Sequence, residues 1–248
     1  MEYPTKIQLQ KREDIKMKRI LLKLSGEALA GANKEIYDMT FVDKVAAAIK
    51  ECADKGHELA VVVGAGNIWR GRAGGDMDRT DADRMGMLAT VINAICLKDA
   101  LTRAGAEAVV MTAIPMHPFA ESYSSQAAKA ALSAGKVVVF GAGLGIPFLS
   151  TDTAGAVRAA EIEADAILMA KNVDYIYDDD PRKNPKAKPI KQIKASEVLA
   201  RNLQAMDATA TAFCLSAGMP VKLFGLKAAE DIVSAVTEGK CGTVISAE

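Results

Sequence analysis

A single lysine, Lys23, lies inside an apolar run of β type at residues 20–24 and is followed at once by Ser25 and Gly26. An unpaired ammonium group is costly to desolvate, so a lysine near the end of a strand needs an anionic partner. The glycine turn and the helix start that follow attract anions through their free backbone N–H groups, which suggests a bound phosphate. An edge-strand lysine whose side chain reaches water is the alternative. On this segment alone, both interpretations stay open.

Two glycine-rich turns follow other apolar runs and could bind the same anion. Residues 64–67 read Gly-Ala-Gly-Asn, with Arg70 shortly beyond, and residues 141–145 read Gly-Ala-Gly-Leu-Gly. Glycines let backbone N–H groups approach phosphate oxygens, and a guanidinium group can donate to two oxygens at once. Because ligands of α/β sheets bind at the carboxyl ends of strands, these turns and Lys23 predict one shared crevice. Glycine turns after strands also occur for purely structural reasons.

The turns match neither of two common nucleotide-binding motifs. The chain contains no Gly-x4-Gly-Lys-Ser/Thr, no complete Gly-x-Gly-x-x-Gly with a suitably placed acidic residue, and no protein-kinase signature. The segment 150–153, Ser-Thr-Asp-Thr, instead resembles a helix N-cap. A P-loop kinase and a dinucleotide-dependent dehydrogenase are therefore disfavoured.

Apolar runs alternate with helical patterns along the chain. Five glycines each end a helical stretch just before a β-type run, and these are Gly56, Gly105, Gly135, Gly218 and Gly239. Several of the runs are apolar at every position, as in a parallel sheet covered by helices on both faces. The sequence thus predicts an α/β fold, a three-layer α/β/α sandwich with a mostly parallel central sheet. Helices are expected at about 41–55, 83–104, 122–134, 152–164, 195–217 with a break, and 227–238. The Lys- and Pro-rich residues 178–194 predict an exposed loop or small hairpin.

The composition of the chain disfavours several classes of function. The 248 residues are enough for one large domain, and 31 basic against 31 acidic residues give no general attraction to nucleic acid or to a membrane surface. No apolar stretch approaches the roughly 18 residues of a membrane span, so a cytoplasmic protein is expected. The four cysteines are far apart and only two histidines are present, which favours buried reduced thiols over a zinc site.

Several segments in order resemble the bacterial uridylate (UMP) kinases of the amino-acid kinase family. They are Lys-Leu-Ser-Gly-Glu-Ala-Leu at 23–29, Gly-Ala-Gly-Asn-Ile-Trp-Arg-Gly at 64–71, Asp-Arg-Met-Gly-Met-Leu-Ala-Thr at 83–90, Pro-Phe-Leu-Ser-Thr-Asp at 147–152 and Glu-Ile-Glu-Ala-Asp at 161–165. The resemblance covers about residues 17–246, and the 83–90 segment is its most specific part. It implies a flexible extension at 1–16 and one domain at 17–248, with an acceptor-binding half at about 17–170 and an ATP-binding half at about 171–248.

The resemblance also implies transfer of the ATP γ-phosphoryl group to UMP, with Mg²⁺ accompanying ATP and no metal held by the protein alone. It implies a homohexamer. The implied catalytic residues are Lys23, Arg70 and Asp207. The implied ATP-binding residues are Lys23, Leu24, Ser25, Gly26, Gly66, Arg70, Lys171, Tyr177 and Asp180. The implied UMP-binding residues are Ala65, Asp83, Leu144, Gly145, Ile146, Pro147, Phe148, Leu149, Ser150 and Thr151, with Asp83 accepting from the ribose hydroxyls.

Several of these residues also have a structural interpretation. Asp83 and Asp207 could cap helices, Tyr177 could be a core aromatic, and Asp180 could be a turn residue before proline. Leu144 and Ile146 stand where many relatives carry Thr and Asn, so backbone groups or water would read the uracil edge. Two other functions remain open: a kinase of the same fold that phosphorylates an amino acid or a carbamate, and a non-catalytic protein that binds nucleotides or oxyanions.

Overall fold

The computed structural model describes residues 17–30, 35–69, 75–179, 183–184, 186–203 and 205–247. The predicted extension at 1–16 lies outside these ranges, as do Arg70 and Asp180.

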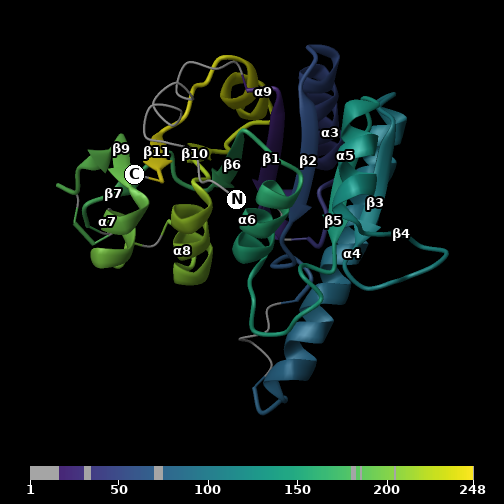
Figure 1. Ribbon diagram of the computed structural model, residues 1–248, viewed down its shortest axis with the longest axis horizontal. Coiled ribbons are helices and arrows are strands. Elements are labelled where there is room, and N and C mark those ends of the chain that lie inside the picture. The colour runs from purple at the N-terminus through teal and green to yellow at the C-terminus, as the bar shows by residue number, and fades with distance from the viewer. Residues whose placement is uncertain are drawn as a thin grey trace.

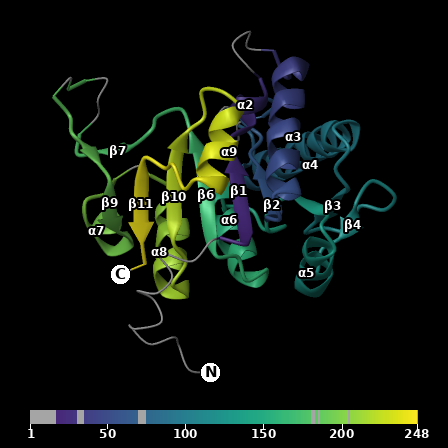
Figure 2. The same cartoon turned by 90° about the horizontal axis from the view of Figure 1, so that it is seen from above.

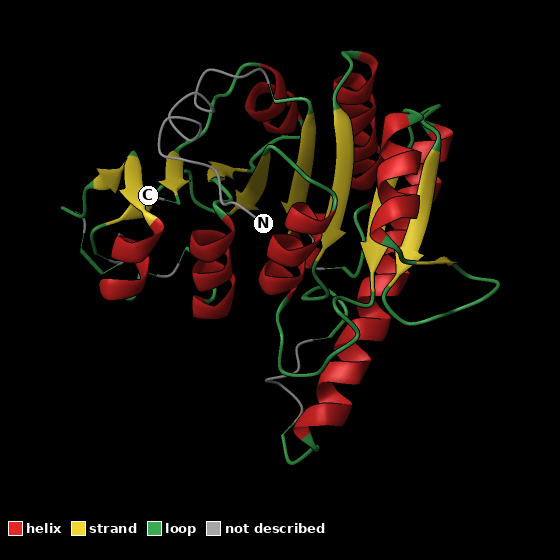
Figure 3. Ribbon diagram, viewed as in Figure 1, coloured by secondary structure: helices red, strands yellow, loops and turns green. Residues whose placement is uncertain are grey.

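One nine-stranded sheet forms the centre of the molecule (Figure 3). In spatial order its strands are β4 (Glu121–Ser122), β3 (Ala108–Thr112), β5 (Val137–Gly141), β2 (Glu58–Val63), β1 (Arg19–Leu24), β6 (Ala166–Lys171), β10 (Val221–Gly225), β11 (Thr243–Ser246) and β9 (Gln192–Lys194). All neighbours pair in parallel except β10 with β11. The predicted boundary between the two halves, at residues 170 and 171, falls at the carboxyl end of β6.

Helices cover both faces of the sheet (Figures 1 and 2). One face packs against α3 (Met39–Asp54), α4 (Arg79–Arg103) and α9 (Glu230–Thr237), and the short α2 (Gly26–Leu29), which follows the central strand β1, adds Leu29 to the same core. The other packs against α5 (Ser125–Ser133), α6 (Thr151–Glu161), α7 (Ala195–Ala200) and α8 (Ala208–Ala217). The predicted three-layer sandwich is confirmed.

The central strands show why the layers form. In β1, Ile20 and Leu22 belong to the core beneath α3 and α9, whereas Leu21 belongs to the core beneath α6. Alternate side chains of a strand point to opposite faces, so a strand that is apolar throughout is stable only between two helical layers.

The five glycines predicted to end helices all adopt the left-handed conformation. Their φ angles are +88° at Gly56, +84° at Gly105, +82° at Gly135, +64° at Gly218 and +67° at Gly239. Glycine reaches this region without the steric cost that a Cβ atom imposes, so each helix can end and the chain can turn directly into the next strand.

Some predicted boundaries require correction. Helix α4 begins at Arg79 rather than at residue 83, because Asp78 caps it by accepting from the N–H groups of Thr80 and Asp81. The polar residues of this first turn have no apolar periodicity that could mark them as helical. The predicted hairpin is present, since β7 (Ile176–Tyr177) pairs antiparallel with β8 (Pro189–Ile190).

Helix α4, with 25 residues, is long and apolar enough to cross a membrane by length and composition alone. However, 44% of its most apolar window is buried inside the protein, where Ala94, Leu97 and Leu101 contribute to the core. This burial is typical of a core helix, which passes the same test as a membrane span.

Candidate active site

Lys23 lies in the interior of the sheet and binds a carboxylate. Its strand runs between β2 and β6, and its neighbours in register are Val62 and Met169. The Nζ atom lies 2.6 Å from Oδ1 of Asp152, and the two side chains are only 9% and 15% exposed. An edge-strand lysine that reaches water is therefore excluded. The anionic partner that desolvation requires is a side chain of the protein itself.

Asp152 is held over Lys23 by the position of α6. Ser150 caps this helix by accepting from the N–H groups of Asp152 and Thr153. A Cβ atom built on Gly155, in the next turn, would lie 3.8 Å from Cγ of Lys23, so α6 lies directly over β1. The first turn of α6 thus brings its carboxylate to the end of the central strand.

A second lysine shares the same carboxylate. Nζ of Lys171, at the end of β6, lies 3.4 Å from Oδ2 of Asp152. Burial raises the pKa of Asp152, but Lys23 and Lys171 outweigh burial, and the net pKa lies below its usual value. Burial lowers the pKa of Lys171, and the charge of Lys23 adds to this lowering while Asp152 opposes it. The site therefore contains two amines around one firmly ionised carboxylate, an arrangement that can exchange the carboxylate for phosphate oxygens.

Asp207 joins this cluster from the start of the neighbouring helix α8. It caps α8 by accepting from the N–H of Ala210 at 2.9 Å, as its structural interpretation required. Its carboxylate also accepts from the hydroxyl groups of Ser150 and of Thr153, the latter at 3.1 Å. The start of α8 is thereby tied to the start of α6, so Asp207 both caps a helix and lies beside the residues predicted to hold nucleotides.

The first two glycine turns meet at close range. A Cβ atom on Gly26 would lie 2.5 Å from the carbonyl oxygen of Gly64 and 2.7 Å from the backbone N of Gly66. Real Cβ atoms essentially never approach backbone atoms this closely, so only glycine allows this contact between α2 and the turn after β2. The segment after Lys23 and the first of the two predicted glycine turns are therefore in direct contact. Ala65, in the same turn, is not among the described residues with positive φ, and alanine fits there.

A buried amide network, which no sequence pattern indicated, fixes the 64–67 turn. The fully buried Asn93 on α4 donates to the carbonyl oxygen of Gly64 at 2.7 Å and exchanges hydrogen bonds with the side chain of Asn67. The hydroxyl of Tyr37 donates to the same Asn93 side chain at 2.8 Å. A satisfied polar network of this kind holds the turn in one conformation.

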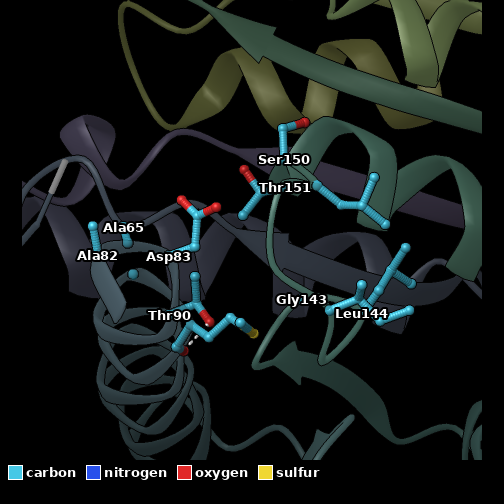
Figure 4. Close-up of a pocket in the computed structure, with 12 residues that line it drawn as sticks. Ala65, Ala82, Asp83, Thr90, Gly143, Leu144, Ser150 and Thr151 are labelled. Atoms are coloured by element: carbon cyan, nitrogen blue, oxygen red, sulfur yellow. Dashed lines mark hydrogen bonds between the residues drawn. The ribbon is translucent and has the colours of Figure 1, made fainter. Parts of the chain in front are cut away.

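A pocket opens between α4 and the 141–150 turn, and Figure 4 shows its lining. It has a volume of about 120 Å³. Its walls are Ala65, Ala82, Asp83, Gly86, Met87, Thr90, Gly143, Leu144, Ile146, Leu149, Ser150 and Thr151. Seven of these are predicted UMP-binding residues: Ala65, Asp83, Leu144, Ile146, Leu149, Ser150 and Thr151. The other predicted residues, Gly145, Pro147 and Phe148, belong to the same loop without lining the pocket.

The loop that forms one wall has an unusual backbone. Ala142, Gly143, Gly145 and Phe148 have φ angles of +61°, +56°, +74° and +69°. Left-handed conformations are strained for residues other than glycine, and such strain is found preferentially at ligand-binding sites. Thr90 supports the loop from α4, because its hydroxyl accepts from the N–H of Ala142 at 2.9 Å.

Asp83 lies in the second turn of α4 and does not cap the helix. Its carboxylate accepts from the backbone N–H of Phe148 at 2.8 Å and from Nε of Arg79 at 3.0 Å. Among the pocket-lining residues, all within the described ranges, Asp83 is the only one with a charged side chain.

Of the remaining predicted ATP residues that the structure describes, Ser25 directly follows β1 and Tyr177 lies on a separate two-stranded sheet. Ser25 caps α2 by accepting from the N–H of Glu27. Tyr177 lies on β7, half-buried, with its ring edge-on to that of Tyr175. The segment before β7 packs closely against Gly242, since a Cβ atom on Gly242 would come within 1.6 Å of the carbonyl oxygen of Asp174. Arg70 and Asp180 are outside the described residues.

Several site residues were not predicted individually. Asp152, Thr90 and Asn93 each act through a contact with a segment distant in the sequence. Thr90 and Asp152 occur in segments that the sequence singled out, but their partners follow only from the packing of α4 and α6.

The fold and site define an α/β protein that gathers lysines, glycine turns and a helix N-terminus at the carboxyl ends of parallel strands, as anion-binding proteins do. The chain belongs to the amino acid kinase family, whose model matches residues 18–225.

Solved structures agree with this assignment. A UMP kinase from Bacillus anthracis is 34% identical, with 94% of this chain and 98% of that chain covered and a TM-score of 0.90. A UMP kinase from Ureaplasma parvum is 36% identical, with 94% and 100% covered and a TM-score of 0.87. An aspartate kinase from Synechocystis is 20% identical, with 93% of this chain but 40% of that chain covered and a TM-score of 0.68, which shows the shared fold alone.

Proposed function

We propose that this chain is a nucleoside monophosphate kinase that transfers the γ-phosphoryl group of ATP to UMP and gives ADP and UDP. The observation that carries the proposal is the acceptor pocket, whose described walls hold one charge, the carboxylate of Asp83. A carboxylate accepts hydrogen bonds from ribose hydroxyl groups and repels the carboxylates of an amino-acid acceptor. The solved UMP kinases, similar over nearly the whole chain, support the same acceptor.

The proposed chemistry fits the groups near the pocket. Ser150 and Thr151 line the pocket at the N-terminus of α6, whose partial positive charge favours the acceptor phosphate. Asp152, the next residue, pairs with Lys23 and Lys171, so both amines lie near the same helix end. The phosphate oxygen of UMP is already ionised, so no general base is required, and catalysis can rest on in-line positioning and on charge neutralisation.

The histidines have structural contacts elsewhere. Nδ1 of His57 lies 2.8 Å from the carbonyl oxygen of Met17, and Nε2 of His117 lies 3.3 Å from the hydroxyl of Ser122. Neither lines the pocket. We therefore assign the catalytic roles to Lys23, Arg70 and Asp207, with Lys23 and Arg70 neutralising the transferred phosphoryl group.

Mg²⁺ is proposed to enter with ATP. In the described ranges no group of three or more His, Cys, Asp or Glu side chains is arranged to hold a metal ion. Mg²⁺ commonly binds substrate phosphates together with one or two carboxylates, and Asp207, which accepts from hydroxyl groups rather than from a lysine, is suited to be one of them. The ion would neutralise part of the phosphate charge.

A homohexamer is part of the proposal, and α4 offers a contact for it. Met85, Leu88, Ile92 and Ile95 are exposed at spacings of three, four and three residues and form a stripe. Antiparallel pairing of two copies about the middle of this stripe would oppose Leu88 to Ile92. We expect Leu88→Glu to reduce the mass measured by light scattering, whereas Val173→Glu, at another exposed apolar residue, should leave it unchanged.

The activity is tested by measuring ADP formation from Mg-ATP with UMP, CMP, aspartate or N-acetylglutamate offered separately. We expect turnover with UMP. Faster turnover with aspartate would replace this proposal by an amino-acid kinase, and nucleotide binding without turnover would indicate a binding protein. A role in pyrimidine nucleotide synthesis follows from the proposed reaction, because UDP is its product, and a cytoplasmic location is part of the proposal.

A further inference from the structure

Arg79 makes an ion pair that ordinary helix energetics do not explain. It is the first residue of α4, and its Nε lies 3.0 Å from each carboxylate oxygen of Asp83, one turn further on. A cation at a helix N-terminus is unfavourable to the helix dipole, and a basic residue four positions before an acidic one is the weaker order of such pairs. Exposed pairs of this kind also contribute little to stability. A residue that opposes local preference is a candidate for a functional role.

The same two residues hold the loop on the opposite side of the pocket. The N–H of Phe148 donates to Oδ2 of Asp83 at 2.8 Å, and the guanidinium carbon of Arg79 lies 5.5 Å from the centre of the Phe148 ring. Phe148 is 65% exposed and has a φ of +69°, so neither burial nor backbone preference keeps it there. Its contacts with Arg79 and Asp83 tie the strained loop to α4.

These contacts fix how Asp83 can receive a ligand. An ionised carboxylate offers about four lone-pair positions, and Arg79 and Phe148 occupy positions on both oxygens. The carboxylate is therefore held in one rotamer at the wall of the pocket before any nucleotide arrives. Such preorganisation improves affinity by removing the entropic cost of ordering the side chain on binding.

We propose that Arg79 is a positioning residue for the acceptor nucleotide, orienting Asp83 toward the ribose hydroxyl groups and holding the Phe148 loop against α4. This inference rests on the proposed function, since it takes the pocket to be the nucleoside monophosphate site. Arg79 does not touch the reacting atoms, and its effect is on acceptor binding and on recognition of the ribose.

The test compares Arg79→Met with Arg84→Met. Arg84 is a matched control on the same helix, since it also pairs with an aspartate, Asp81, and is 65% exposed against 53% for Arg79. ADP formation is measured at saturating Mg-ATP with UMP and with 2′-deoxy-UMP. We expect Arg79→Met to raise the KM for UMP about three- to tenfold, within the range given by ordering one side chain, and to change kcat less than about twofold.

Discrimination between the two acceptors is the sharper readout. Asp83 should favour UMP over its 2′-deoxy analogue in the wild-type enzyme, and Arg79→Met should reduce that preference while the KM for ATP and the melting temperature stay unchanged. Should Arg79→Met not fold, Arg79→Lys carries the test with the same expected direction, because lysine retains the charge without the planar two-oxygen contact.

The outcomes separate the two proposals. A wild-type protein that does not phosphorylate UMP removes the proposed function. If the wild-type protein phosphorylates UMP but Arg79→Met matches Arg84→Met in both KM and acceptor preference, only the proposed role of Arg79 is overturned.

Discussion

Replacing Lys23 by methionine tests whether this lysine serves catalysis or only the fold. Methionine keeps the length of the apolar stem and removes the charge. Breaking a buried ion pair typically costs about 3–5 kcal/mol, because it leaves an uncompensated charge. Here Lys171 remains 3.4 Å from Asp152, so we expect a smaller loss, about 1–3 kcal/mol. For a domain of this size that loss lowers Tm by roughly 2–12 °C.

The loss of activity should be much larger than the loss of stability implies. Removing one preorganised group that stabilises transition-state charge costs on the order of 10² or more in rate. We therefore expect Lys23→Met to lower kcat for UMP phosphorylation by about that factor at a temperature where the variant is fully folded. The measurements are steady-state ADP formation and a thermal melt followed by circular dichroism.

A second substitution separates the two roles. In the double variant Lys23→Met with Asp152→Asn, the carboxylate that Lys23 neutralised is gone, but Lys171 also loses its partner at 3.4 Å, so stability should stay about 1–3 kcal/mol below the wild type rather than recover fully. Activity should not recover, because the positive charge is still missing. A kcat of Lys23→Met within about threefold of the wild type would be a loss far below that expected for a charge-stabilising group. That result, or recovery of kcat when Asp152→Asn is added, would show that Lys23 serves only to neutralise Asp152.

Three further predictions concern close packing beside the site, the charge of Asp152 and the buried cysteines. Gly26→Ala should lower both Tm and activity, since its Cβ would lie 2.5 Å from the carbonyl oxygen of Gly64; a variant that melts and turns over like the wild type would contradict the close contact. The pKa of Asp152 is below its usual value, so its ion pairs stabilise the fold above the unfolded-state pKa of about 3.9 and this contribution is lost as pH falls through the lower folded value. The stability difference between wild type and Asp152→Asn, from urea titrations at several pH values, should therefore shrink only in acid; a constant difference would show that charge is not its cause. Burial raises the pKa of the Cys52 and Cys214 thiols to about 12, so iodoacetamide at about pH 8 should alkylate them only after unfolding, and rapid labelling of the native protein would refute this.

The layers could be predicted well from the sequence because their cause is local. A strand that is apolar throughout needs cover on both faces, and a glycine after a helix needs no tertiary context to adopt a positive φ. The start of α4 was predicted less well, because its first turn contains mainly polar residues and is stabilised by the cap from Asp78. A cap identifies a helix start from the sequence only when an apolar repeat follows it directly.

The hydrogen bonds of Asn93 are a part of the site that could not be predicted from the sequence. Asn93 is fully buried on α4 and bonds Gly64, Asn67 and Tyr37, which lie on other segments of the chain. Nothing in its local sequence distinguishes it from an exposed asparagine. Only the distance between α4 and the turn after β2 selects it, and that distance is a property of the packed sheet.

The pairing of Lys23 with Asp152 combines a requirement that the sequence predicts with a contact that only the packed fold shows. Desolvation alone required an anion at Lys23, but it could not tell a ligand from a side chain, because either removes the same penalty. The structure shows that the protein supplies its own anion at the start of α6, beside Ser150 and Thr151 in the acceptor pocket. A phosphate that binds Lys23 must therefore compete with Asp152, and the lysine has an anionic partner before and after the nucleotide binds. With the catalytic role proposed for Lys23, this pairing explains how a buried cation can be kept in the core of a sheet without destabilising the protein between turnovers.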